Sequence, residues 1–152
     1  MIDLDDIDRA ILRVVQKDAS ISMDSLSNVV NLSRNACWRR LKSLEDAGVI
    51  KQRVALVDPA HVGKGLHVMA MIRTSAHDAQ WMASFDRAVR TMPEIVGAHR
   101  MSGDLDYVLR IRVKNVADYD RFYKELISRV SVSDISASFV MEDIKDTTEI
   151  PV

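Results

Sequence analysis

The first 50 residues place apolar side chains three and four positions apart, which is the spacing of amphipathic helices. One such stripe consists of Leu4, Ile7, Ile11 and Val14. A second, shorter helix fits residues 23–30, with Ser22 as its N-cap. A third helix begins at Ser33 and ends before Gly48. A tight turn at 31–32 separates the last two helices, and this order predicts a helix-turn-helix.

The second half of the chain alternates between strand and helix patterns. Strands are expected where apolar residues alternate with polar ones or run together, and helices where apolar residues recur every three to four positions. The expected order is strand 66–74, helix 81–92, strand 95–101, strand 107–113, helix 116–130 and strand 135–141. This βαββαβ order is that of a ferredoxin-like fold, and the fold class is therefore α+β.

A strand and a linker are expected between the two halves. Residues 49–57 have the composition of a strand, which Asp58 and Pro59 close. The loop around Gly63 and Gly65 is the best candidate for a boundary. We therefore predict a helix-turn-helix domain at 1–49, a strand and linker at 50–64, and a βαββαβ domain at 65–152.

The charge balance and the cysteine count limit which binding partners and which cellular compartment are expected for the protein. The 152-residue chain carries 21 Lys and Arg against 22 Asp and Glu, so any site for a polyanion must be a local patch. Its single cysteine excludes a disulfide within the chain and a cysteine-rich metal cluster. The acidic N-terminus lacks the apolar core of a signal peptide, and no apolar run approaches the roughly 18 residues that span a bilayer. These features predict a cytoplasmic protein without membrane contact.

Positive charge is concentrated in one short stretch. Residues 34–53 contain six Lys and Arg but only two acids. On a helical projection, Cys37, Leu41 and Leu44 share one apolar face. Cys37 is therefore expected to pack as a small hydrophobic residue rather than to react as a thiolate.

The opposite face of this helix carries basic and amide side chains, and this composition predicts contact with DNA. Arg and Asn side chains match guanine and adenine edges in the major groove, and Lys and Arg neutralise phosphates. The alternative is a solvated basic face in which Trp38 packs on a neighbouring helix or on the second domain. Arg40 lies at the edge of the apolar face and is expected to pair with Asp5 or Asp8. The predicted contacts with double-stranded DNA are Ser33, Arg34, Asn35, Trp38, Arg39 and Lys42.

Four stretches of the sequence resemble the Lrp/AsnC family, the feast/famine transcriptional regulators. They are LDDIDRAILRVVQKDA, LSRNACWRRLKSLEDAGVI, RMSGDLDY and the pattern ME-IK-TT near the C-terminus. The resemblance implies a winged helix-turn-helix domain joined to an ACT-like (RAM) effector domain. It also implies homodimers formed through the second domain, further assembly to octamers, and regulation of amino-acid metabolism in response to a small amino acid. The variants ACWRR and RMSGDLDYVLR are most similar to a branch that includes cysteine-responsive regulators.

The resemblance places an effector site in a loop of the second domain. Asp106 matches the family position that binds the effector, and we expect it to bind the ammonium group of an amino acid. Gly103 permits close approach of a ligand, and the backbone amides of residues 102–104 are expected to bind its carboxylate. Without the resemblance, Gly103-Asp104 is ordinary hairpin chemistry. The candidate effector residues are Ser102, Gly103, Asp104, Leu105, Asp106, Tyr107, Ser136 and Ser138.

An enzyme is the alternative function. Sirohaem decarboxylases resemble the same family, and His99 and Arg100 beside the loop are side chains of the type that would line a tetrapyrrole pocket. The basic third helix favours the regulator. We predict neither a metal nor a cofactor, because the sequence contains no P-loop, GxGxxG, GxSxG or zinc motif. No metal-ligand spacing relates the four histidines, His61, His67, His77 and His99.

Overall fold

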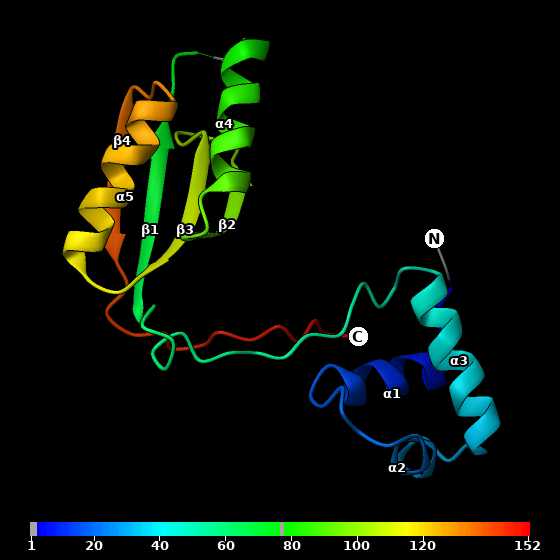
Figure 1. Ribbon diagram of the computed structural model, residues 1–152. Helices are drawn as coiled ribbons and strands as arrows, with labels where there is room; N and C mark the ends of the chain where they lie inside the picture. The colour runs from blue at the N-terminus through cyan, green and yellow to red at the C-terminus, as the bar shows by residue number, and fades with distance from the viewer. Residues whose placement is uncertain (1–2, 77) are drawn as a thin grey trace. The chain divides into compact units, whose positions relative to one another are not determined.

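The computed structural model describes residues 3–76 and 78–152, which divide into two units (Figure 1). The first unit contains the chain up to Leu56 together with Lys145–Val152, and the second contains Val57–Ile144. The first is helical, whereas the second is built on a four-stranded sheet. His77, one of the four histidines of the sequence, lies outside the described residues.

The first unit is a helix-turn-helix, which confirms the prediction. Its helices are α1 (Asp6–Val15), α2 (Met23–Val29) and α3 (Arg34–Asp46). Each begins with a side-chain oxygen that accepts an amide hydrogen bond, from Asp5 for α1, Ser22 for α2 and Ser33 for α3. Asn31, with a φ of 52°, makes the turn between α2 and α3. The core of this unit buries Ile11, Leu12, Leu26, Cys37, Leu41 and Leu44.

Residues 49–57 form no strand with any described part of the chain, so the predicted strand is wrong for this single chain. A strand needs a neighbouring strand for its backbone hydrogen bonds, and none pairs with this segment. Instead, the Ile50 amide donates to the Leu44 carbonyl at 3.1 Å, just beyond the end of α3. The Arg53 guanidinium then binds the Glu45 carboxylate at 2.7 Å. The segment is therefore held against α3 by local bonds rather than by a sheet.

The C-terminal residues pack on α1. The Gln16 side chain accepts a hydrogen bond from the Ile150 amide at 2.7 Å and donates one to the Ile150 carbonyl at 3.1 Å. Nε of Arg13 donates to the carbonyl oxygen of Val152 at 2.8 Å. The predicted boundaries placed Lys145–Val152 in the second domain, whereas these bonds group the segment with the first unit.

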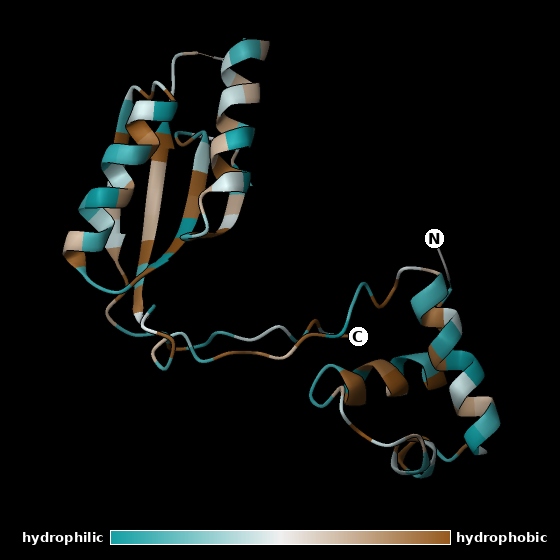
Figure 2. Cartoon of the chain, viewed as in Figure 1, coloured by the Kyte–Doolittle hydropathy of each residue, from teal (hydrophilic) through white to brown (hydrophobic). Residues whose placement is uncertain are grey.

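The second unit has the predicted ferredoxin-like βαββαβ order. Its elements are β1 (Leu66–Arg73), α4 (Ala79–Thr91), β2 (Ile95–Arg100), β3 (Tyr107–Val113), α5 (Val116–Arg129) and β4 (Asp134–Phe139). The strands form one antiparallel sheet in the order β2-β3-β1-β4. Both helices lie against the same face of this sheet (Figure 1). Figure 2 shows apolar residues along β1 and β3 and more polar ones on the outer sides of the two helices.

The two faces of the sheet differ in their surroundings. Toward the helices, the strands bury Val68, Ala70, Ile72, Leu109, Ile111 and Val113. The alternate residues point to the other face, where Met69, Met71 and Arg110 are half-buried although no described helix covers them. Nε2 of His67 and Nε of Arg110 are buried without a hydrogen-bond partner in the described part of the chain. We call this second surface the open face.

Candidate functional site

α3 carries the predicted DNA contacts on its exposed side. The opposite side packs into the core, where Cys37 is 0% exposed, and burial raises the pKa of its thiol. Trp38 keeps 55% of its surface exposed, so it is not packed away on a neighbouring helix. The predicted residues are all exposed, and together they define what we call the α3 outer face: Ser33, Arg34, Asn35, Trp38, Arg39 and Lys42.

Two of the cations on the α3 outer face already have an acidic partner. Nζ of Lys42 lies 2.8 Å from the Asp46 carboxylate, and this hydrogen-bonded partner raises the pKa of Lys42. Nε of Arg34 lies 3.4 Å from the carboxylate of Asp24 on α2. Arg39 takes part in none of the ion pairs that the described residues form within this unit. Arg34 and Lys42 would have to break an ion pair before they bind a phosphate. Arg39 would not, because it has no such ion pair among the described residues of this unit.

Arg40 has the structural role that the sequence predicted. Its Nη1 lies 2.7 Å from the Asp5 carboxylate and 2.8 Å from the Asp8 carboxylate. Asp5 thus accepts the amide of Asp8 and the guanidinium of Arg40, and both bonds lower the pKa of Asp5. The pair ties α3 to the N-terminal end of α1 and so fixes the orientation of α3.

Acid should weaken this attachment. Since the folded-state pKa of Asp5 is lowered, its contribution to stability is complete above the unfolded pKa, about 3.9. The contribution is lost as the pH falls through the folded-state pKa. Asp5→Asn keeps an N-cap acceptor but removes the charge. We expect it to lower the thermal unfolding midpoint of the helical unit by about 2–4 °C at pH 7 and by less at pH 3. Asp3→Asn removes a nearby charge and serves as the control, and an equal loss at both pH values would contradict the ion-pair role.

The predicted effector loop joins β2 to β3 and is anchored on β1. The Asp106 amide donates to the Ile72 carbonyl at 3.0 Å, and the Asp106 carboxylate accepts the Thr74 amide at 2.8 Å. The Met101 amide closes the loop on the Asp106 carbonyl at 2.8 Å. Gly103 has a φ of 108°, and a Cβ there would meet no atom within 4 Å. Asp106 therefore shapes the loop through both its backbone amide and its carboxylate.

The structure separates the other predicted effector residues. Tyr107 lies on the helix-covered face, where its ring centroid is 4.4 Å from that of Phe85. Tyr107 is therefore part of the aromatic packing of this unit, and its contact with an effector stays a prediction. Ser136 and Ser138 are exposed on β4, opposite Met71 and Met69 on β1. No hydrogen bond given by the structure joins either serine to the loop.

Arg73, the last residue of β1, contacts the loop although the sequence did not predict it. Its Nε donates to the Asp104 carbonyl of the loop at 3.0 Å, and its Nη1 lies 3.1 Å from the carboxylate of Asp134 on β4. Neither partner is near in sequence, so no spacing could have revealed these contacts. A cation at the end of a mostly apolar strand was the available signal.

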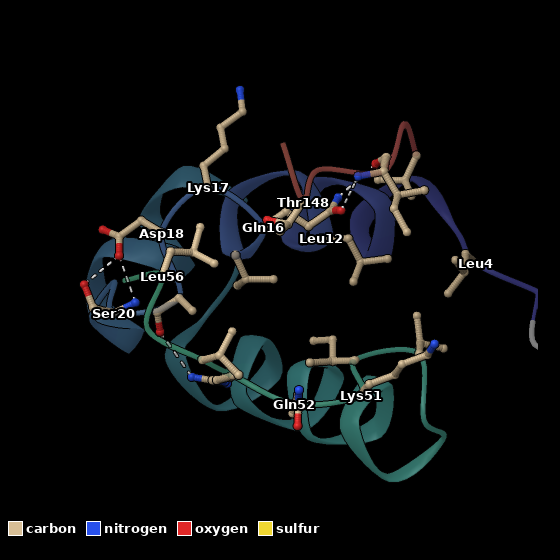
Figure 3. Close-up of a pocket in the computed structure, with 18 residues that line it drawn as sticks. Leu4, Leu12, Gln16, Lys17, Asp18, Ser20, Lys51, Gln52, Leu56 and Thr148 are labelled. Atoms are coloured by element: carbon tan, nitrogen blue, oxygen red, sulfur yellow. Dashed lines mark hydrogen bonds between the residues drawn. The ribbon is translucent and has the colours of Figure 1, made fainter. Parts of the chain in front are cut away.

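A cavity of about 710 Å³ lies in the first unit, between α1, the segment 49–56 and the C-terminal residues (Figure 3). Leu12 and Leu56 line it, and the dashed lines at Gln16 include its bonds to the C-terminal segment. None of the predicted DNA or effector residues is among those that line it. The cavity therefore belongs to neither of the two predicted sites.

Neither a metal cluster nor a membrane-spanning helix occurs in the part of the chain that the structure describes. Nowhere in the described ranges do three His, Cys, Asp or Glu side chains gather as they would around a metal ion. Of the helices described, none has the length and apolar character needed to cross a bilayer.

Two family models match the chain in the order of its units. Residues 4–51 match a winged helix-turn-helix DNA-binding model, and residues 67–150 match the Lrp/AsnC ligand binding domain. The chain belongs to the Lrp/AsnC family. Members of this family are DNA-binding transcriptional regulators, and the predicted winged helix-turn-helix joined to an α+β effector domain is confirmed.

Named relatives cover nearly the whole of this Lrp/AsnC chain. The glutamate uptake regulatory protein of Zymomonas mobilis is 45% identical over 149 residues, which are 98% of this chain and 91% of the relative. The DNA-binding transcriptional activator DecR of Escherichia coli K12 is 43% identical over 150 residues, 98% of this chain and 99% of the relative. The enzyme alternative finds no support in these two names.

Solved structures show the same fold. An AsnC family transcriptional regulator from Agrobacterium tumefaciens is 45% identical, with a TM-score of 0.93 over 97% of this chain and 96% of that one. A transcriptional regulator from Neisseria meningitidis, solved as a complex with L-Met, is 34% identical, with a TM-score of 0.94 over 98% of this chain and 97% of that one.

Proposed function

We propose that this Lrp/AsnC protein is a sequence-specific DNA-binding regulator of amino-acid metabolism whose DNA binding or assembly responds to a small amino acid. The observation that carries the proposal is the α3 outer face, an exposed set of cationic, amide and aromatic side chains on a helix whose other side is buried. In a protein with a net charge of −1, such a local cationic surface is suited to a polyanionic partner.

Each residue of the α3 outer face has a distinct part in DNA binding. Asn35 and Arg39 have the side-chain groups that read adenine and guanine edges. Lys42 and Arg34 neutralise phosphates, which replace Asp46 and Asp24 as their partners. Trp38 supplies an apolar surface for a thymine methyl group or a sugar. The Ser33 hydroxyl remains the cap of α3 and brings the helix N-terminus toward a phosphate.

The open face of the sheet supports a homodimer. It combines the half-buried apolar side chains Met69 and Met71 with buried nitrogen atoms of His67 and Arg110 that have no partner in the described chain. A second copy on this face would bury the apolar atoms and offer partners to the polar ones. Association of dimers into octamers is a further step of the same proposal.

The effector is proposed to be a small free amino acid that binds at the loop 101–107. The complex of the Neisseria meningitidis regulator with L-Met supports this class of ligand. Cysteine is our first candidate, because ACWRR and RMSGDLDYVLR resemble the cysteine-responsive branch. Binding would favour one assembly, or one spacing of the helix-turn-helix units, and so change the affinity for the operator.

The test is a gel shift with the DNA upstream of this gene and of its neighbours. Non-specific competitor DNA and physiological salt are used, and the shift is repeated with each of the 20 common amino acids. We expect a specific shift whose midpoint changes with one of them. Sedimentation of the same samples measures the assembly.

Two outcomes would count against the proposal. A protein with no preference for any upstream fragment over a scrambled one would contradict the DNA-binding function. A specific shift that none of the amino acids changes would leave the DNA function in place but remove the effector part.

A further inference from the structure

The Arg73 side chain contacts both the effector loop and β4, the strand that carries Ser136 and Ser138. Its Nε binds the Asp104 carbonyl at 3.0 Å, and its Nη1 binds the Asp134 carboxylate at 3.1 Å. The backbone carbonyl of Arg73 also accepts the Ser133 amide at 3.0 Å. The end of β1 thus holds together two segments that are some thirty residues apart in the chain.

The charges around Arg73 suit a zwitterion. Three acids, Asp104, Asp106 and Asp134, belong to the segments that it joins. Their negative charges would attract the ammonium group of an amino acid, and the Arg73 guanidinium would attract its carboxylate. A guanidinium has five N–H donors, and the two bonds above leave some of them for a ligand. The Arg73 side chain is 50% exposed, so these donors can be reached from solvent.

The space beside Arg73 is also suitable. Gly103 follows Ser102 in the loop with a φ of 108°, and nothing lies within 4 Å of where its Cβ would be. A ligand can therefore approach the backbone next to the Asp104 carbonyl that Arg73 holds.

We propose that Arg73 is a specificity-determining residue of the effector site and that its guanidinium binds the α-carboxylate of the amino acid. The Asp106 carboxylate binds the ammonium group of the same ligand. This inference rests on the proposed function and deepens it. The carboxylate was expected to bind the backbone amides of the loop, whereas here the Arg73 guanidinium binds it. Arg73 is then the group that selects α-amino acids over amines. The bond to the Asp104 carbonyl sets the shape of the loop at the same time.

The test pairs a change in the protein with a change in the ligand. L-Methionine and L-cysteine are the probes, and 3-(methylthio)propylamine and cysteamine are the same molecules without the carboxylate. Affinities for the full-length wild type, Arg73→Met and Arg73→Lys are measured by titration calorimetry. Arg100→Met is the matched control, because it removes the same charge beside the same loop, but its partner in the sheet is Tyr107, on the helix-covered face.

We expect the wild type to bind each amino acid about 30-fold more tightly than its amine. Arg73→Met should lose that preference, so that the amino acid weakens by about 30-fold while the amine changes by less than about 3-fold. Arg73→Lys keeps the charge without the planar fork and should retain part of the preference. Arg100→Met should behave as wild type.

The outcomes separate the two proposals. If Arg73→Met weakens the amino acid and its amine by the same factor, Arg73 only shapes the loop and the inference is wrong. If wild type binds neither probe, the other common amino acids are titrated, and each ligand found is compared with its own amine. If none of them binds, the effector part of the proposed function fails and this inference fails with it. Thermal unfolding curves that match those of the wild type show that the chain remains folded in every variant.

Discussion

Replacing Arg39 and Lys42 together by alanine is expected to weaken binding to the specific DNA fragment by about 100-fold. The variant lacks the Arg39 guanidinium, which forms no ion pair with the described residues of its unit and is proposed to contact base edges. It also lacks the Lys42 ammonium, which is proposed to neutralise a phosphate. The plot of log affinity against log salt concentration should become shallower by about 1 for each phosphate that the variant leaves without a cation. Fluorescence anisotropy over a series of salt concentrations measures both quantities.

The single variants and a charge-matched control sharpen this prediction. Arg39→Ala should reduce the preference for the specific sequence, and Lys42→Ala should weaken specific and scrambled DNA equally. The control removes Arg90 and Lys124, two exposed cations of the second unit that, like Lys42, pair with an acid four residues away. An unchanged salt dependence in Arg39→Ala/Lys42→Ala would mean that the α3 outer face is only solvated.

Asp106→Ala is expected to abolish the amino-acid response while DNA binding without effector stays as in wild type. The variant loses the acceptor for the Thr74 amide, which lies 2.8 Å away, and the negative charge proposed to bind the ligand's ammonium group. We expect ligand affinity to fall by about 100-fold, because a charged hydrogen bond and the shape of the loop are removed together. The measurement is the effector titration of the gel shift, repeated with this variant.

Two further variants test whether the charge of Asp106 or its hydrogen bond within the loop is needed for the response. Asp106→Asn can still accept the Thr74 amide but is neutral, so it should lose the response if the charge binds the ligand. A normal response in Asp106→Asn would show that Asp106 acts only on the shape of the loop. Asp86→Ala is the control, since it removes an exposed acid of α4 in the same unit that pairs with Arg90.

Much of each unit was predictable because its pattern is local. The stripes of three and four residues indicated the helices, and Cys37, Leu41 and Leu44 are buried on α3 as expected. The alternation in β1 and β3 indicated the sheet, whose faces depend only on odd and even positions. Arg40 was placed correctly because it stands at the edge of an apolar face where an acid of α1 can reach it.

What the sequence did not reveal depends on partners distant in the chain. The contact between Arg73 and Asp104, and that between Thr74 and Asp106, form only after β1 and β3 have paired. Gln16 binds Ile150 across almost the whole chain, so periodicity in either segment says nothing about their pairing. The strand expected at 49–57 has strand-like composition, but composition does not supply the neighbouring strand that pairing requires.

The burial of Cys37 has a practical consequence for labelling. It is the single cysteine of the chain, its side chain is inaccessible in the core, and burial keeps its thiol protonated by raising the pKa. A maleimide dye or a spin label would therefore react with a cysteine introduced at the surface and leave the native one untouched. One label in the helix-turn-helix unit and one on the second unit away from the loop 101–107 would then report whether the separation between the labels changes when an amino acid is added.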